Sequence, residues 1–140
     1  MNTEPLNEVS LVIPIVPDIE VAAIETAAAV AEYMKFDEDK IDELKLALIE
    51  ACINAFEHSN SKDNKLYIKF IMHSTELAVI IRDNGRGFDP GSIELNPKIE
   101  SKLKSTYKRG WGLMLIRKLM DTVDIESSPE GTTLKMTKLK

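Results

Sequence analysis

The chain has 140 residues, of which 44% are hydrophobic, with 18 basic and 23 acidic side chains, a formal net charge of −5 and a single cysteine. This length suits one domain with one core, and the apolar share excludes a disordered or fibrous chain. The charge is uneven, because residues 1–60 carry 13 acidic and 3 basic side chains whereas residues 61–140 carry 10 acidic and 15 basic. Such asymmetry is typical of a nucleic-acid surface, a protein partner or a site for a small anion, and the acidity of the whole chain weakens the first.

Signals for export or membrane insertion are not visible in the sequence. Residues 1–10 are polar and acidic and lack the basic and apolar regions of a secretory signal. No apolar run reaches the roughly 20 residues that span a bilayer. Cys52 lies in an apolar stretch and has no second cysteine with which to pair, so we expect a small core residue in a reducing compartment. We therefore predict a cytoplasmic protein without membrane contact.

The first half of the chain predicts one strand followed by two helices. Residues 9–16 are rich in β-branched side chains and are followed by a proline, which is typical of a strand. Asp18 is then expected to cap an alanine-rich helix over residues 19–35. A second helix is expected over about residues 39–58, because apolar side chains recur there every three or four positions. The side chains expected to face inward are Ile41, Leu44, Leu48, Ala51 and Ala55.

The second half predicts four strands, a long loop and a short helix. Residues 66–72 and 77–81 are expected to pair as an antiparallel hairpin. Residues 88–109 show neither the apolar periodicity of a helix nor that of a strand. So long a loop in a compact domain is usually a lid, a binding loop or disordered. A helix and two strands close the chain, over residues 113–121, 123–126 and 132–138. This order predicts an α+β fold, a two-layer α/β sandwich with helices on one face of a mixed, largely antiparallel sheet.

Glu50, Asn54 and His58 are spaced four residues apart on the second predicted helix. Each such step turns by about 40° and rises about 6 Å, so the three side chains can share one stripe. Glu50 could accept a proton and the Asn54 carboxamide oxygen could bind Mg²⁺, although a solvated helix edge explains the same spacing. Asn54 favours a functional interpretation, because asparagine is a poor mid-helix residue and its neighbours are apolar. His58 is better explained by the helix dipole than as a metal ligand.

The segment from Asp83 to Gly87 contains two glycines directly after a predicted strand. Its Asn-Gly pair is a common hairpin-turn signal, but no predicted strand follows Gly87. Glycines at positions 85 and 87 would let the backbone approach a planar ligand closely. An ionised Asp83 can accept a hydrogen bond from an exocyclic amine, and adenine carries such an amine.

Gly110-Trp111-Gly112 opens the short predicted helix directly after Lys108 and Arg109. Amides at a helix start, flexible glycines and nearby cations are typical of a phosphate-binding corner, although so short a pattern is weak by itself. The chain has no GxxxxGK[ST] pattern, which excludes a P-loop. Trp111 suits either a core position or a contact beneath the loop.

Together these motifs resemble those of the GHKL superfamily, which includes gyrase, MutL and histidine kinases. Glu50-x-x-x-Asn54 corresponds to the N box of that superfamily. Asp83-x-Gly85-x-Gly87 and Gly110-x-Gly112 correspond to its two glycine boxes, and Gly131-Thr132 corresponds to its closing box, in the same order and with similar spacing. The resemblance covers essentially the whole chain. Its compact length, the run from Glu50 to Ala55 and the tail from Asp124 to Thr133 are similar to bacterial anti-sigma factor serine/threonine kinases of the RsbW and SpoIIAB type.

This resemblance implies a Bergerat fold, with residues 1–140 as one ATP-binding domain and an ATP lid over about 88–109. Glu50 would be the general base that activates a partner's serine or threonine hydroxyl, and Asn54 would hold Mg²⁺. Asp83 would bind the adenine amino group. The other residues at ATP would be Gly85, Gly87 and Thr132 near adenine and Lys108, Arg109, Gly110 and Gly112 near the phosphates. Residues 98–118 carry seven basic side chains and one acidic, so a triphosphate explains the uneven charge better than DNA.

Members of this family bind a sigma factor as homodimers and phosphorylate a STAS-domain antagonist. The resemblance therefore implies an ATP-dependent protein kinase and anti-sigma factor with those partners and without direct contact with nucleic acid. Three alternatives stay open: a nucleotide-binding module that sequesters its partner without phosphorylating it, a serine kinase of another partner-switching pathway, and the catalytic domain of a histidine kinase. The last is disfavoured, because neither His58 nor His73 is placed as a phospho-acceptor.

Overall fold

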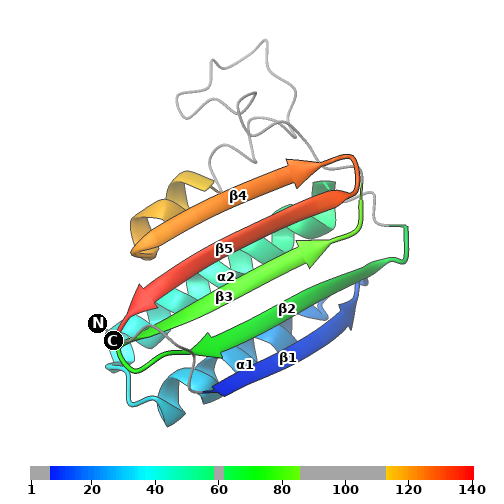
Figure 1. Cartoon of the computed structure of the whole chain (residues 1–140). Helices are drawn as coiled ribbons and strands as arrows, with labels where there is room; N and C mark the ends of the chain where they lie inside the picture. Colours follow the sequence, from blue (N-terminus) through cyan, green and yellow to red (C-terminus); the bar gives the residue numbers. More distant parts are fainter. Residues whose placement is uncertain (1–6, 59–61, 86–112) are drawn as a thin grey trace.

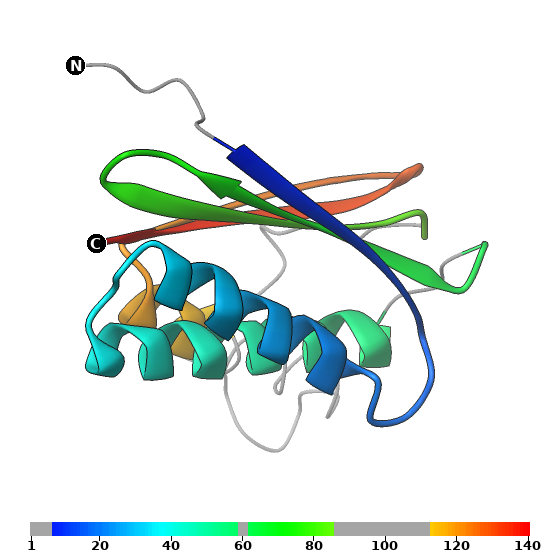
Figure 2. The same cartoon turned by 90° about the horizontal axis from the view of Figure 1, so that it is seen from below.

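A computed structural model describes residues 7–58, 62–85 and 113–140, which form a two-layer sandwich (Figures 1 and 2). One layer is a five-stranded sheet in the order β1-β2-β3-β5-β4, and all four neighbouring pairs are antiparallel. The strands are β1 (Asn7–Pro14), β2 (Lys65–Met72), β3 (Glu76–Asp83), β4 (Thr122–Ser128) and β5 (Gly131–Leu139). The described strands thus confirm the predicted α+β sandwich and show antiparallel pairing only.

The second layer contains α1 (Glu20–Tyr33), α2 (Glu38–His58) and a short helix over residues 113–119. Figure 2 shows all three helices on the same face of the sheet. Among the described residues, no helix is long and apolar enough to cross a membrane.

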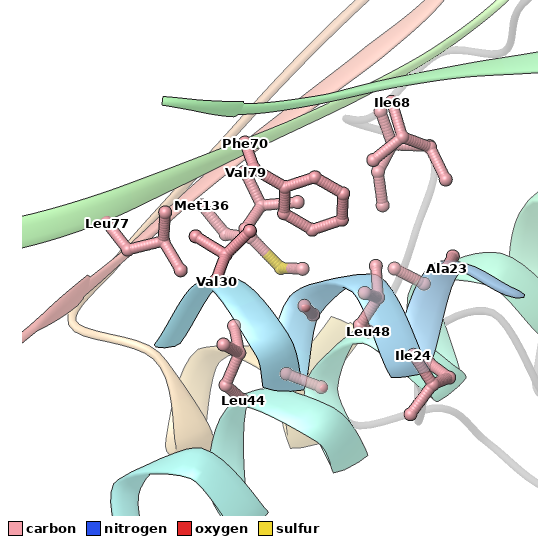
Figure 3. Packing of buried hydrophobic residues seen from close by; sticks show 14 of the residues in the cluster. Ala23, Ile24, Val30, Leu44, Leu48, Ile68, Phe70, Leu77, Val79 and Met136 are labelled. Atoms are coloured by element: carbon pink, nitrogen blue, oxygen red, sulfur yellow. The ribbon is translucent and has the colours of Figure 1, made fainter. Parts of the chain in front are cut away.

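The core lies between the two layers (Figure 3). Side chains of β2 alternate between buried and more exposed positions, as expected for a sheet with one covered face. In the register Phe70 lies opposite Val79, and Val79 lies opposite Met136, so three strands contribute one continuous apolar row. Burying one such side chain contributes about 1.5–3 kcal/mol. A shift of one residue would turn this row to the open face, so the core fixes the register that also positions the site.

The inner face of α2 follows its predicted periodicity. Ile41, Leu44, Leu48 and Ala51 are buried, and Ala55 packs partly buried against them. Three alanines of α1, at positions 23, 27 and 31, are also fully buried. Their small side chains let α1 approach its neighbours closely, so the two long helices form a compact layer beneath the sheet.

The predicted cap of the first helix is wrong. The helix begins at Glu20 with Ile19 at the N-cap, and no side chain caps it. Asp18 has a φ of 69°, a conformation that short polar residues tolerate, and its carbonyl accepts the N–H of Val21 at 3.5 Å. Asp18 therefore belongs to the turn between β1 and α1 rather than to the helix.

Cys52 is a core residue, as predicted. Its side chain is fully buried on α2, and burial raises the pKa of its thiol from 9.0 to about 12. A thiol that keeps its proton at neutral pH is a poor nucleophile, so Cys52 contributes packing rather than chemistry.

Candidate nucleotide-binding site

One end of the sandwich gathers the sequence motifs that lie in described residues. The last turns of α2, the end of β3 and the turn between β4 and β5 all lie there (Figures 1 and 2). The antiparallel register places Asp83, the last residue of β3, opposite Thr132 near the start of β5. Glu50 and Asn54 lie in the second half of α2. The fold therefore brings the last turns of α2, which include Asn54, to the same end as Asp83 and Thr132.

Asp83 is a buried carboxylate at the edge of the core. It continues the alternation of Leu77, Val79 and Ile81, so its side chain faces the helix layer, and it is only 7% exposed. Its Oδ1 accepts the backbone N–H of Gly85 at 2.8 Å. Since a carboxylate can accept about four hydrogen bonds, Asp83 retains acceptor capacity for a ligand amine. A buried carboxylate is costly without such partners, which favours a binding role at this position.

Asn84 and Gly85 do not begin a hairpin. Both sides of β3 are already paired, with β2 and with β5, so no position beside it is open to a following strand. The Asn84 Nδ2 instead donates to Oδ2 of Asp63 at 3.1 Å, and the Tyr67 hydroxyl donates to the same carboxylate. That hydrogen bond from Tyr67 raises the pKa of its hydroxyl above the usual value. Asp63 thus holds the end of β3 against the segment that leads into β2.

Gly131 permits the close approach of β5 to β3. Its φ is +149°, a region that side-chain-bearing residues rarely adopt, and a Cβ built there would lie 2.2 Å from the Asp83 carbonyl oxygen. The next residue, Thr132, is half-buried, and its hydroxyl lies 3.0 Å from the hydroxyl of Ser127 on β4. The closing Gly-Thr pair therefore sets the wall of the site beside Asp83. Ser127 is not among the predicted site residues, and its signal in the sequence is its position across the tight β4–β5 turn from Thr132.

The Asn54 carboxamide carries an unpaired buried atom. Its Nδ2 is inaccessible to solvent and has no hydrogen-bond partner among the described residues. Leaving such a group unpaired costs about 1–3 kcal/mol. Rotation about the last side-chain bond exchanges the nitrogen and oxygen, so the same position can present a donor or an acceptor. A neutral oxygen of this kind suits Mg²⁺, and half-buried Glu50 lies one helical turn away.

The described residues contain no cluster of three or more histidine, cysteine or acidic side chains that could hold a metal ion. Mg²⁺ commonly takes one or two protein ligands and otherwise binds phosphates and water, so the single carboxamide oxygen of Asn54 would be a sufficient protein donor. The donor set therefore fits a metal that arrives with a nucleotide.

The sequence profile of the histidine kinase-like ATPase domain matches residues 16–138. The chain belongs to this family. It is 35% identical over 117 residues to the serine-protein kinase RsbW of Bacillus thuringiensis, covering 81% of this chain and 72% of that protein. It is also 33% identical over 135 residues to RsbW of Bacillus velezensis, covering 93% of this chain and 84% of that protein. The chain is thus an RsbW-like member of the histidine kinase-like ATPases, and ATP is the nucleotide of this family.

Solved structures agree on the fold of this histidine kinase-like ATPase. The RsbU and RsbW domains of a Mycobacterium tuberculosis protein match with a TM-score of 0.70 at 16% identity, over 96% of this chain and 32% of that chain. The histidine kinase AdeS of Acinetobacter baumannii matches with a TM-score of 0.54 at 14% identity, over 96% of this chain and 68% of that chain. The chain thus spans about a third of the first protein, and both likenesses confirm the predicted fold class.

Several predicted site residues lie outside the described residues. They are Gly87, Lys108, Arg109, Gly110, Trp111 and Gly112, together with the whole predicted lid over 88–109. The side chain of His58 is likewise outside. The proposed roles of Gly87 at adenine and of Lys108, Arg109, Gly110 and Gly112 at the phosphates therefore stay predictions. Asp83, Gly85 and Thr132 lie together at the end of the sheet.

Proposed function

We propose that this protein is an ATP-dependent serine/threonine protein kinase and anti-sigma factor, which phosphorylates a STAS-domain antagonist and sequesters a sigma factor. Protein kinase activity follows from its family and from relatives named serine-protein kinase RsbW. The observation that carries the nucleotide site is the buried Asp83 carboxylate beside Thr132 at the end of β3. We propose that Asp83 accepts a hydrogen bond from the adenine amino group.

Phosphoryl transfer needs mainly positioning and neutralisation of charge. Asn54 would hold Mg²⁺, which supplies positive charge at the phosphates when bound. Glu50 would take the proton from the partner's serine or threonine hydroxyl as that oxygen bonds to the γ-phosphorus and ADP leaves. The unpaired Asn54 carboxamide and the half-buried Glu50, one helical turn apart, support this division of roles. Lys108, Arg109, Gly110 and Gly112 are proposed to contact the phosphates, with Gly85 and Gly87 at adenine.

The test is transfer of label from γ-labelled ATP with Mg²⁺ to purified STAS-domain proteins of the same organism. We expect phosphoserine or phosphothreonine on one of them. Acid-labile phosphohistidine would instead support a histidine kinase. ATP binding without transfer to any of these proteins would favour a module that binds nucleotide and only sequesters its partner.

The partners are the second part of the proposal. We propose a homodimer that binds a sigma factor in the cytoplasm without direct contact with nucleic acid or membrane. Affinity capture of the tagged protein from its native cells should recover a sigma factor, and capture should weaken when the unphosphorylated antagonist is added. Recovery of an antagonist without any sigma factor would point to another partner-switching pathway. Light scattering of the purified protein tests the dimer.

A further inference from the structure

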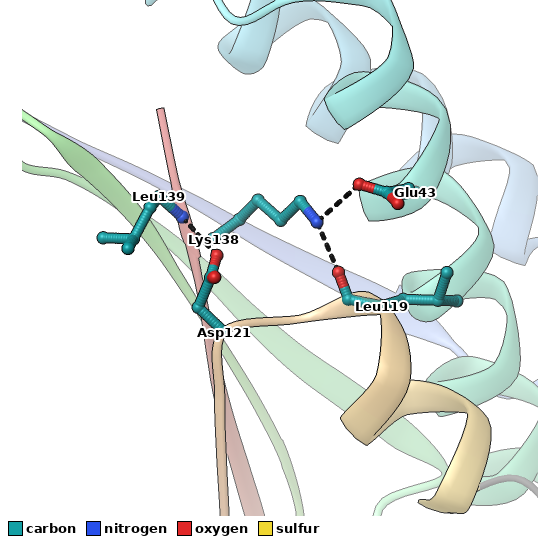
Figure 4. Close-up of polar contacts among 5 residues, drawn as sticks. All are labelled: Glu43, Leu119, Asp121, Lys138 and Leu139. Carbon is teal, nitrogen blue, oxygen red and sulfur yellow. Dashed lines mark hydrogen bonds and ion pairs between the residues drawn. The ribbon is translucent and has the colours of Figure 1, made fainter.

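A buried lysine joins three elements at the opposite end of the sheet. Lys138 of β5 is 6% exposed and faces the helix layer, opposite Leu77 of β3. Its Nζ donates to Oε1 of Glu43 on α2 at 2.8 Å and to the carbonyl oxygen of Leu119 (Figure 4). Leu119 is the last residue of the helix over residues 113–119. One ammonium group therefore connects the last strand with two helices.

Packing alone does not explain a lysine at this position. Met136 and Leu134 occupy the preceding positions on the same face of β5, and an apolar side chain could continue that row without loss of hydration. Lysine is rarely buried unless it is paired, and buried ion pairs contribute little net stability compared with apolar packing. A cation at a helix C-terminus does interact favourably with the last carbonyl groups. The contact is thus better suited to fixing geometry than to adding stability.

The end of the short helix is also anchored directly to β5. The N–H of Asp121 donates to the Thr137 carbonyl at 2.9 Å, and Oδ2 of Asp121 accepts the N–H of Leu139 at 2.7 Å. These bonds fix the chain where it leaves the helix, but they do not involve α2. Within the described part of the chain, the Lys138 side chain also links this helix end to α2.

We propose that Lys138 is a positioning residue for nucleotide binding, acting through the helix over residues 113–119. This inference rests on the proposed function, in which Gly112, one position before residue 113 in the sequence, is proposed to lie at the phosphates and Asn54 of α2 is proposed to hold the metal. The described part of this helix, residues 113–119, is about 10 Å long, and the contacts of its end with both β5 and α2 restrict how it can tilt. By linking that end to Glu43, Lys138 fixes the position of the helix over residues 113–119, on the proposed phosphate side, relative to α2, on the proposed metal side.

The test measures Mg²⁺-ADP and adenosine separately by calorimetry with the full chain. Lys138→Met keeps the length of the stem and removes the ammonium. We expect ADP to bind about tenfold more weakly, since mutations in a network that connects two sites change their coupling by roughly this factor. Adenosine, which lacks phosphates and meets the Asp83 end, should bind unchanged. The matched control is Lys69→Met, which removes an exposed lysine of β2 that pairs with Glu8 at 3.8 Å and should change neither affinity.

Glu43→Gln gives a second measurement, because it removes the charge of the partly exposed Glu43 side chain while the glutamine oxygen can still accept a hydrogen bond from the buried Lys138 ammonium. It should weaken ADP binding selectively, and add no further loss in the Lys138→Met background. The inference is overturned if both variants leave ADP affinity unchanged, or if adenosine binding falls as much as ADP binding. A wild-type protein that binds neither compound would contradict the proposed function itself.

Discussion

The sheet buries one charged side chain at each end of its helix-covered face, and the two are treated differently. Lys138 has partners from two other elements, so its charge is satisfied within the protein. Asp83 uses one oxygen for the Gly85 amide and lies at the end that also contains the unpaired carboxamide of Asn54. The two charged side chains are therefore equally buried but have different roles. A satisfied charge organises the fold, whereas spare polar capacity at one end marks the place for a ligand.

The largest expected effect is on catalysis. Glu50→Gln should lower phosphoryl transfer by about 10²–10⁴-fold, because general-base catalysis contributes about that much. ATP affinity should stay close to that of the wild type, since the side chain is proposed to contact the acceptor hydroxyl rather than the nucleotide. Initial rates of label transfer and calorimetric affinity test the two parts separately. An unchanged transfer rate would remove Glu50 from the mechanism.

The next effect concerns adenine recognition. Asp83→Asn should weaken ATP binding by about 1.5–3 kcal/mol, the range for a hydrogen bond to a charged group. Asparagine can still accept the Gly85 amide, so the end of β3 should keep its conformation. Asp124→Asn, an exposed position on β4, is the matched control and should have no effect. Equal ATP affinities for Asp83→Asn and the wild type would show that the buried Asp83 carboxylate does not bind the nucleotide.

A smaller effect is expected from replacing Asn54, which should stabilise the fold while impairing Mg²⁺-dependent binding. Asn54→Leu should raise the free energy of unfolding of the nucleotide-free protein by about 1 kcal/mol, because it removes an unpaired buried amide. The same change should abolish the dependence of ADP binding on Mg²⁺. Urea unfolding and titrations with and without Mg²⁺ measure both. A destabilised variant that still binds Mg²⁺-ADP would show that Asn54 is an ordinary packed residue.

The smallest effect is on thiol chemistry. Because burial raises the pKa of Cys52 to about 12, the folded protein should resist alkylation at neutral pH and react only when unfolded. The unfolded thiol ionises near 9.0 while the folded one keeps its proton, so this group should destabilise the fold as pH rises above about 9. Labelling with iodoacetamide in buffer and in urea tests the first point. Rapid labelling of the folded protein would contradict it.

Periodicity along the chain was sufficient to predict the helices, most of the strands and the buried face of α2. A local pattern also singled out Asp83, which follows a strand and precedes a glycine turn, whereas Thr132 was implied only by the family resemblance. Local patterns did not predict the links of Asn84 with Asp63 or of Lys138 with Glu43, which lies 95 positions away. Such contacts depend on strand register and helix packing, which local patterns do not contain. The cap assigned to Asp18 was wrong for a related reason, because the turn after β1 determined where the helix could begin.

The place of β5 in the sheet has a consequence for synthesis. This strand lies between β3 and β4 although it comes last among the five, so until residues 131–139 leave the ribosome β3 lacks one neighbour and β4 has no described strand partner. The wall formed by Gly131 and Thr132 is absent over the same interval. A nascent chain can therefore form its α1–α2 layer and the β1–β3 sheet early, but it gains the side of the site proposed for adenine only after residues 131–139 have emerged.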